Sequence, residues 1–295
     1  MEGFSIFAIL TDSCADLRPD FVAEQQDFFV LPLSYTIGGE TYLDSPGAGL
    51  DSKTFYARLR GGEVAITSQV NGHAFCEAAR SFLSRGLDVL YVAFSSGLSG
   101  TYQSSLIAQE ELKKEFPDRR FVAVDTLAAS AGQAMLAYCA VDLRAQGKTL
   151  DETAAWLIEN RLHVAHWFTV DDLNFLKRGG RCSPAAAFFG SMLSIKPVLH
   201  VDNEGHLIAR EKVRGRAHAL RGLLAQMEQL RQGPVDQRVF ISNAACLDDA
   251  QALVQMIHDQ IGVPLDKFII SDIGPVIGSH AGPGTLALFF FADHR

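Results

Sequence analysis

The fold is decided by residues 88–102, which read Asp88-Val89-Leu90-Tyr91-Val92-Ala93-Phe94-Ser95-Ser96-Gly97-Leu98-Ser99-Gly100-Thr101-Tyr102. The apolar run Asp88–Phe94 has the length of a buried strand, and it passes directly into a turn of serines and glycines. In an open parallel sheet, ligands bind in the crevice beyond the carboxyl ends of the strands. The stretch therefore predicts a strand of a parallel α/β sheet with a polar site at its end.

The rest of the first half repeats this alternation of strands and helices. Apolar runs predict further strands at Phe4–Leu10, Phe28–Ile37 and Phe121–Val124. Asn71 can cap a helix with one apolar stripe, and Gly86 stands where the glycine after a helix belongs. The pattern is typical of a doubly wound, mostly parallel sheet with helices on both faces.

The second half changes its order of elements. The turn Asp202-Asn203-Glu204-Gly205 between two strand-like runs predicts a hairpin. The expected strands are His163–Thr169, Leu193–Val201, Leu207–Val213, Arg238–Ser242, Leu265–Ser271 and Thr285–Phe291, and the expected helices are Asp171–Arg178, Ala217–Gln232 and Leu247–Ile261. With 295 residues, we predict an α/β fold of two domains, a doubly wound sheet domain over residues 1–160 and a mixed α+β domain over residues 161–295, with a ligand between them.

Charge and cysteine usage exclude several classes of protein. The 34 acidic and 26 basic residues give a formal charge of −8, which opposes binding to nucleic acid. The 5 cysteines are scattered and form no C-x-x-C pair. The first residues are acidic where a signal peptide is basic, and no apolar run approaches the ~18 residues of a membrane span. We expect a cytoplasmic protein without stable membrane insertion.

Small hydroxyl side chains gather at the predicted strand ends. Thr11-Asp12-Ser13, Ser95-Ser96 and Asp125-Thr126 each follow a strand, and the predicted loop Ala65–Gln69 adds Thr67 and Ser68. Serine and threonine are ordinary helix caps, so any one of these turns alone is best explained by capping. Four together at one edge of a sheet indicate a site for a carboxylate, a phosphate or another polar head group.

Two further clusters lie in the second half. Lys177-Arg178-Gly179-Gly180-Arg181 places three cations around a glycine pair, and residues 274–285 surround His280 with glycine and proline in what we predict to be a loop. A basic series fits either one solvated strand face or a docking or phosphate patch: Arg210, Lys212, Arg214, Arg216 and Arg221.

Motifs for several kinds of chemistry are missing from the sequence. It contains no G-x-x-x-x-G-K-[ST] loop and no H-E-x-x-H, and Gly97-Leu98-Ser99-Gly100 misses the G-x-S-x-G elbow by one position. We therefore expect no cofactor and no metal. Two alternatives stay open at this point: a serine hydrolase acting on acyl esters through Ser96, His280 and either Asp12 or Asp125, and a protein that binds a sugar phosphate or a nucleotide.

Five separated stretches resemble the DegV family, the fatty-acid-binding subunits of bacterial fatty acid kinases. They follow in order along nearly the whole chain: Leu10-Thr11-Asp12-Ser13 with Ala15-Asp16, Thr67-Ser68-Gln69, residues 95–103, Phe168–Leu173 through Gly179-Gly180-Arg181, and Gly278-Ser279-His280-Ala281-Gly282-Pro283-Gly284. The resemblance implies a cytoplasmic bacterial protein that buries a long-chain fatty acid between its domains. It also implies that the chain is not itself an enzyme, and that it presents the carboxylate to a kinase subunit with a dihydroxyacetone-kinase-like ATP domain, which forms an acyl phosphate for phospholipid synthesis.

The resemblance also assigns residues to the ligand. The family's carboxylate-binding hydroxyls align with Thr67, beside Ser68, and with the pair Ser95 and Ser96. Its G-G-R arginine aligns with Arg181, and the histidine of its G-S-H-x-G-P-G motif aligns with His280. The residue after Thr67-Ser68-Gln69 is Val70, without the Pro-Ser common in the family, and Cys14 and Cys182 replace frequent Thr and Ile. These departures bear on the choice of acyl chain.

These assignments lead to a hypothesis about what each residue does for the ligand. Thr67 and Ser96 bind the head group through hydroxyls, which can donate to a carboxylate and accept from the protonated acid. Arg181 and His280 serve the phosphoryl step or the added charge of the acyl phosphate. The acyl tail lies along an apolar run that an ordinary core helix would explain equally well: Phe188, Phe189, Met192, Leu193 and Ile195.

Overall fold

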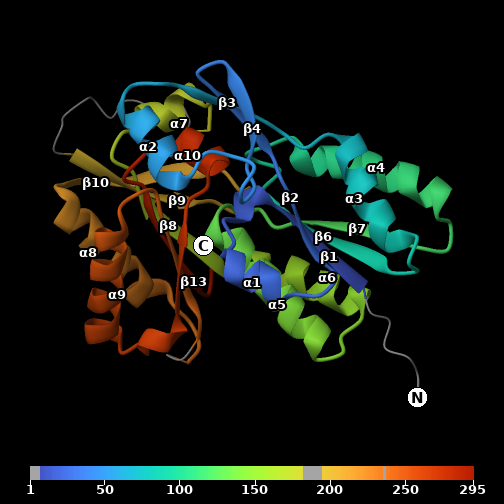
Figure 1. The fold of residues 1–295 in the computed structure, drawn as a ribbon. Helices are drawn as coiled ribbons and strands as arrows, with labels where there is room; N and C mark the ends of the chain where they lie inside the picture. The colour runs from blue at the N-terminus through green and yellow to red at the C-terminus, as the bar shows by residue number, and fades with distance from the viewer. Residues whose placement is uncertain (1–6, 182–194, 235–236) are drawn as a thin grey trace.

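The computed structural model describes residues 7–181, 195–234 and 237–295. Its first sheet is parallel throughout, which agrees with the predicted mostly parallel sheet, and its strands follow the order β2-β1-β6-β7 (Figure 1). These strands are β1 (Phe7–Asp12), β2 (Phe28–Leu31), β6 (Asp88–Ala93) and β7 (Phe121–Asp125). On one face lie α3 (Gly72–Leu83) and α4 (Thr101–Glu115), and on the other lie α5 (Ala131–Ala145) and α6 (Leu150–Asn160). The doubly wound architecture is confirmed.

The second sheet is mixed, in the order β10-β9-β8-β13-β11-β12. The predicted hairpin is confirmed, because β9 and β10 pair antiparallel around the Asp202–Gly205 turn. The strands are β8 (Val164–Thr169), β9 (Ile195–Val201), β10 (Leu207–Arg214), β11 (Val239–Asn243), β12 (Phe268–Asp272) and β13 (Leu286–Phe291). Helices α8 (Arg216–Leu230) and α9 (Leu247–Ile261) cover the face away from the first sheet (Figure 1).

A third, small sheet was not predicted. The run Phe28–Ile37, predicted as one strand, divides at Pro32, which has no N–H to donate to a sheet. Its second part pairs in the order β4-β3-β5, and the predicted loop at residues 65–69 is mostly strand. The elements of this region are β3 (Ser34–Ile37), β4 (Glu40–Leu43), α2 (Ser52–Arg60) and β5 (Ala65–Ser68).

Helix α10 (Pro275–Ala281) replaces the loop that we predicted from its glycines. Pro275 occupies the first helical position, where its missing N–H costs nothing. Residues 265–271, predicted as a strand throughout, begin as the turn η4 (Leu265–Lys267) before β12. The remaining short elements are η1 (Ser13–Ala15), α1 (Pro19–Glu24), η2 (Arg161–His163) and α7 (Asn174–Arg178).

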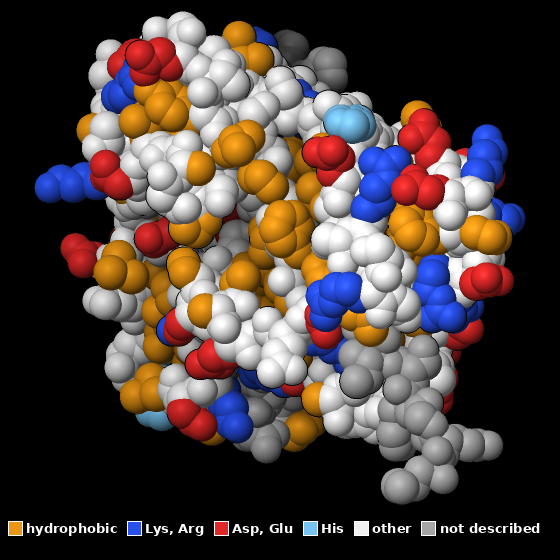
Figure 2. All heavy atoms as spheres, turned by 45° about the vertical axis from the view of Figure 1, so that its right-hand side comes forward, with side chains coloured by type: hydrophobic (Ala, Val, Ile, Leu, Met, Phe, Trp, Pro, Cys, Tyr) orange, Lys and Arg blue, Asp and Glu red, His pale blue; other side chains and the backbone are white. Residues whose placement is uncertain are grey.

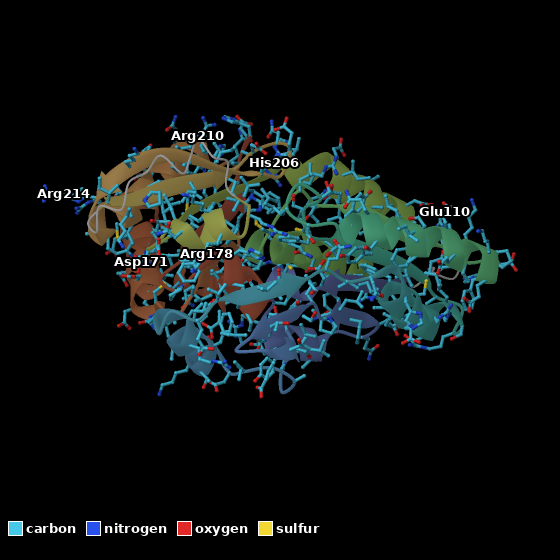
Figure 3. The ribbon with its side chains drawn as sticks, turned by 90° about the horizontal axis from the view of Figure 1, so that it is seen from above. Glu110, Asp171, Arg178, His206, Arg210 and Arg214 are labelled. Atoms are coloured by element: carbon cyan, nitrogen blue, oxygen red, sulfur yellow. The ribbon has the colours of Figure 1, made fainter. Side chains whose placement is uncertain are left out.

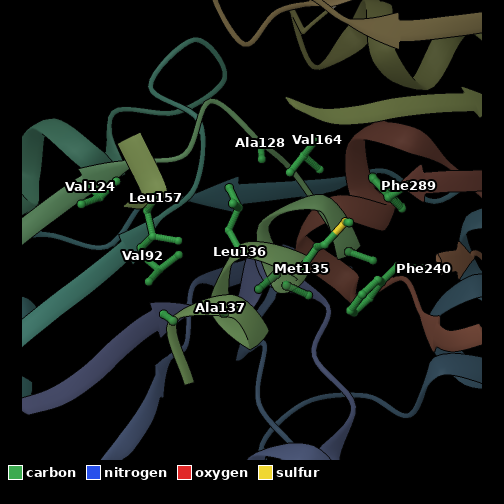
Figure 4. Close-up of a cluster of buried hydrophobic side chains, with 14 of the residues drawn as sticks. Val92, Val124, Ala128, Met135, Leu136, Ala137, Leu157, Val164, Phe240 and Phe289 are labelled. Carbon is green, nitrogen blue, oxygen red and sulfur yellow. The ribbon is translucent and has the colours of Figure 1, made fainter. Parts of the chain in front are cut away.

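Helix α5 joins the two larger sheets through one shared core. Its buried face contacts Val92 and Val124 of the first sheet and Val164, Phe240 and Phe289 of the second, as Figure 4 shows. Most of the residues that α5 contributes to this core are alanines: Ala131, Ala134, Met135, Leu136, Ala137 and Ala140. This cluster removes apolar surface from water on both sides of the helix, so it holds the two domains against each other.

The molecular surface mixes charged and apolar side chains. On the face shown in Figure 2, hydrophobic side chains gather in a hollow near the centre. Figure 3 shows Arg210 and Arg214 on β10, with Arg214 projecting at the outer side of the molecule. Within the described residues, no helix combines the length and the apolar character needed to cross a membrane.

Candidate functional site: a cavity between the two domains

A cavity of about 430 Å³ lies between the two domains. Its walls come from the ends of the first sheet, from β5, from α7 and α10, and from the inner face of the second sheet. Most of its lining is apolar: Leu33, Phe94, Leu98, Ala129, Phe168, Leu176, Val201, Leu207, Ile273, Val276, Ile277, Ala281, Ala287 and Phe289. A cavity of this size and character is suited to a small molecule with a long apolar part.

Polar side chains meet at one part of this wall. Thr67 and Ser68 stand at the end of β5, and His280 reaches Thr67 from the last turn of α10. The Thr67 hydroxyl oxygen and the His280 Nε2 atom are 2.8 Å apart. Burial, and to a smaller extent the charge of Arg181, lowers the pKa of His280 to about 4. The imidazole is therefore neutral at pH 7.

The tautomer of His280 follows from its other nitrogen. Nδ1 is buried and has no hydrogen-bond partner among the described residues. It faces Gly179, where a Cβ atom would come within 2.2 Å of it. A buried N–H without an acceptor is rarer than a buried lone pair without a donor, so we assign the proton to Nε2. Nε2–H then donates to the Thr67 oxygen, which leaves the Thr67 hydroxyl hydrogen free to donate to a ligand.

Arg181 is the cation among the described lining residues. Its Nε donates to the carbonyl of Leu98 at 3.2 Å, and its Nη1 donates to the carbonyl of Gly179. These bonds tie the guanidinium to both domains and fix its plane beside His280. The structure therefore brings together four of the predicted residues: Thr67, Ser68, Arg181 and His280.

Ser95 and Ser96 are not among the residues that line the cavity in the described part of the chain. The Ser95 hydroxyl donates to the Gly205 carbonyl at 3.0 Å and accepts from the Gly97 N–H, so it attaches the β9–β10 hairpin to the first domain. The backbone N–H of Ser96 donates to Asp125. Both serines thus shape the turn at the end of β6, and their contact with a ligand stays a prediction.

Ser99 lines the cavity in the same turn, and the sequence argument did not select it. Its hydroxyl lies 2.9 Å from the Thr101 hydroxyl and accepts from the Thr101 N–H at the start of α4. Gln69 and Gly100 adjoin it in the wall. The signal was present, because Ser99 stands two residues before α4, where the N-terminal N–H groups of the helix converge. Ser95 and Ser96 are serines of the same turn, and the residue type alone does not separate them from Ser99.

Four further polar residues lie along the described wall: Cys14, Ser130, His166 and Thr285. Burial raises the pKa of Cys14 well above its ordinary value and lowers that of His166, so both side chains are neutral. His166 has its Nδ1 2.8 Å from the Val164 carbonyl, and we assign the proton to that nitrogen. Because these groups are neutral, Arg181 has no second cation beside it among the described residues of the wall.

The groups required by a serine hydrolase are not assembled in the described residues. His280 Nε2 bonds to Thr67 rather than to a serine at the end of β6. Asp12 accepts from the Tyr91 hydroxyl at 2.6 Å and from the Phe94 N–H at 3.2 Å, and burial is the main cause that raises its pKa. Asp125 accepts from the N–H groups of the turn. Nothing in this arrangement supports the hydrolase alternative.

The segment predicted to contact the acyl tail lies mostly outside the residues that the structure describes. Phe188, Phe189, Met192 and Leu193 lie outside the described residues, and Ile195 begins β9, whose last residue Val201 lines the cavity.

One cluster of possible metal ligands lies at the tip of the β9–β10 hairpin. Asp202, Glu204 and His206 bring ligand atoms within 4.8 Å of one another. The Asp202 Oδ1 atom already accepts from the N–H groups of the other two residues, as in an Asx turn. The cluster therefore has a local structural explanation.

Arg295 is a second tie between the domains that the sequence did not reveal. Its guanidinium is buried and donates to five backbone carbonyls, those of Thr126, Leu127, Arg161, Val164 and Asp202. These carbonyls belong to the end of the first sheet, the start of the second sheet and the hairpin turn. Arg295 thus holds three segments behind the cavity.

Taken together, the fold and the site define a two-domain α/β protein with a ligand cavity at the domain boundary. The model of the DegV family, described as a family of uncharacterised proteins, matches residues 6–293. The chain belongs to this family.

Close relatives match over their whole length. A DegV domain-containing protein of Clostridium perfringens is 45% identical, over 98% of this chain and 98% of the relative. A DegV domain-containing protein of Lactococcus lactis is 40% identical, over 96% of each chain.

Solved structures agree with the fold. A DegV family protein of Thermus thermophilus, described as binding fatty acid, is 32% identical with a TM-score of 0.86, covering 97% of this chain and 99% of that one. The fatty-acid-binding DegV protein of Bacillus subtilis is 28% identical with a TM-score of 0.81, covering 98% and 100%.

Proposed function

We propose that this protein is a cytoplasmic carrier of a long-chain fatty acid, which it holds in the cavity between its domains. The observation that carries the proposal is a cavity of about 430 Å³ whose walls are mostly apolar and whose polar groups include the hydrogen-bonded pair Thr67 and His280. Fatty acid binding by similar DegV proteins of Thermus thermophilus and Bacillus subtilis supports it.

The balance of energies suits such a ligand. Burial of a CH₂ group stabilises a complex by about 0.8 kcal/mol, so some fourteen methylenes contribute up to ~11 kcal/mol. Lost freedom of motion on binding costs about 4 kcal/mol or more, so it offsets a large share of this contribution. The apolar tail is still the main source of affinity, and the head group needs only modest hydrogen bonds.

The head group is assigned to the polar part of the wall. The free hydrogen of Thr67 donates to the carboxylate, with Ser68 beside it in the sequence and Ser99, two residues before α4, in the same cavity wall. Arg181 offers a positive charge at the same place, held by two backbone carbonyls. Ser95 and Ser96 then act by shaping the turn that carries Ser99.

We further propose that a separate ATP-dependent kinase subunit phosphorylates the bound carboxylate, and that the chain itself has no turnover. Arg181 is the described lining residue that can balance the additional negative charge of an acyl phosphate. His280 is neutral at pH 7 and serves this step through Thr67, by holding the hydroxyl hydrogen toward the ligand.

The test of the carrier function begins with the protein as purified from bacterial cells. Mass spectrometry of a denatured sample should release close to one free fatty acid per chain, and delipidated protein should bind palmitate again. Protein that carries no lipid and fails to bind palmitate after delipidation would refute the carrier function.

The kinase step is tested separately. With a cognate kinase and ATP, Arg181→Ala should still carry the fatty acid but form acyl phosphate more slowly than wild type. Equal rates of phosphorylation by the two proteins would remove Arg181 from this step.

A further inference from the structure

The first turn of α10 is held by two carboxyl groups from the other domain. Asp16 accepts the N–H of Gly274 through Oδ1 at 2.7 Å, and Asp44 accepts the N–H of Val276 through Oδ2 at 3.2 Å. A Cβ atom on Gly274 would lie 3.1 Å from an oxygen of each carboxyl group, so glycine permits this close approach. Acceptors at this position satisfy N–H groups that have no partner within the helix.

Asp16 is itself fixed from two sides. The hydroxyl of Ser130 donates to its Oδ2, and the same hydroxyl lies 2.8 Å from that of Ser242 in the second sheet. Asp16 is 6% exposed, and its backbone is left-handed, with a φ of 49°. A chain of hydrogen bonds therefore runs from α10 through Asp16 and Ser130 to the second sheet.

The other end of α10 carries His280. His280 stands six positions after Gly274, which at a rise of about 1.5 Å per residue is about 9 Å along one short helix. The carbonyl of Ile273, just before the helix, accepts the Tyr56 hydroxyl at 2.7 Å. The start of α10 is thus anchored to the first domain, and any shift of that start moves His280 relative to Thr67.

We infer that Asp16 and Asp44 are positioning residues of the head-group site: by holding the first turn of α10 they keep His280 Nε2 on the Thr67 hydroxyl. The inference rests on the proposed function for its consequence, which is the direction in which Thr67 donates to a carboxylate. The strand end at Thr11 and the residue Asp16 both stand out in the sequence. Of the segment Thr11–Asp16, the described wall contains only Cys14. Positioning of α10 gives a role to Asp16 outside that wall.

The test compares variants that remove the acceptor with variants that retain it. Asp16→Gly removes the carboxyl without backbone strain, because glycine tolerates a positive φ. Asp16→Asn keeps an oxygen for Gly274, and its amide can donate to Ser130. Asp44→Ala and Asp44→Asn form a second pair on Val276, which serves if Asp16→Gly does not fold.

The readout is nitrogen NMR of the histidine side chains in delipidated protein, with His280 assigned by loss of its signals in His280→Gln. Wild type and both asparagine variants should show the Nε2–H tautomer at pH 7.5. Asp16→Gly and Asp44→Ala should show a mixture of tautomers and a His280 titration midpoint raised from about 4 toward the ordinary 6.5.

Two results would overturn the inference. One is a folded Asp16→Gly or Asp44→Ala protein with the tautomer and midpoint of wild type, and the other is an asparagine variant that behaves like the variant lacking the acceptor. Because no fatty acid is present, these results are independent of the carrier function. If His280 shifts as expected while palmitate still fails to bind to wild type, the proposed function fails and the positioning role stands.

Discussion

We expect the free energy of unfolding of Asp44→Asn, measured relative to that of wild type, to be higher at neutral pH than at acid pH. Burial is the main cause that raises the pKa of Asp44 from 3.8 to about 6, and the nearby Asp12 adds to it. The hydrogen bonds from Val276 and Ser13 lower the pKa but do not compensate. Asparagine retains an oxygen for the Val276 N–H and carries no charge to bury.

The magnitude follows from the difference between the folded and unfolded pKa values. The folded protein holds the Asp44 proton more tightly, so this proton stabilises the fold fully below pH 3.8, and the stabilisation is lost as the pH rises through about 6. Two pKa units correspond to about 3 kcal/mol, of which about 1.4 kcal/mol falls between pH 5 and pH 7.5. Asp44→Asn has no carboxyl group to ionise, so it does not lose this stability. Its free energy of unfolding relative to wild type should therefore rise by about 1.4 kcal/mol between pH 5 and pH 7.5.

Urea unfolding of wild type and Asp44→Asn at pH 5.0, 6.0 and 7.5 measures this difference. Asp51→Asn is the control, because hydrogen bonds from Thr54 lower the pKa of the exposed Asp51. The stability of that variant relative to wild type should not rise with pH. A difference between Asp44→Asn and wild type that is the same at all three pH values would show that the pKa of Asp44 is not raised in the folded protein, and the reasoning would fail.

Three other substitutions test the cavity and its supports. Thr67→Val should weaken palmitate binding about 10- to 100-fold in displacement of a fluorescent fatty acid, because a hydrogen bond to a charged group contributes about 1.5 to 3 kcal/mol; Thr67→Ser should bind as wild type does, and equal affinity of the valine variant would contradict the assigned role. Gly179→Ala should displace His280, since the new Cβ would lie 2.2 Å from Nδ1; an unchanged NMR titration of His280 would refute this. Ser95→Ala breaks the bond to the Gly205 carbonyl and should cost about 1 kcal/mol in urea unfolding with lipid content unchanged; a loss of lipid would instead indicate direct contact with the head group.

The parallel sheet could be predicted from the sequence because each of its strands has a local signal, a short run of apolar residues. Asp88–Ala93 is buried at every residue, and an unbroken apolar run of that length fits a strand covered on both faces. The small sheet has no such signal. β5 is a strand of four residues, partly exposed, and it exists because it pairs with β3 some thirty residues earlier. A pairing between distant segments cannot be deduced from the composition of either one.

Helix α10 escaped prediction for a different reason. We interpreted its glycines as signs of a loop, but they serve close packing. A Cβ atom on Gly278 would come within 2.4 Å of the Tyr56 hydroxyl, and Gly282 ends the helix with a φ of 79°. The same ambiguity affected the serines after β6, where capping and cavity lining require the same residue type. Thr67 and His280 stood out from the residue pattern, and the family resemblance then assigned both to the ligand. Their direct contact became visible only in the structure.

A cavity between the domains requires contacts at its border that hold the two domains apart. Apolar side chains that border an unfilled volume of about 430 Å³ lack packing partners on one side and so lose dispersion contacts there. Such a space would favour closer approach of the two sheets unless polar contacts at its border held them apart. Asp16 on α10, Ser95 on the hairpin and Arg295 on five carbonyls are contacts of this kind, and each requires one relative position of the domains. A ligand tail that fills the space restores the missing contacts. The geometry that destabilises the protein without ligand therefore makes an apolar ligand stabilise the folded state.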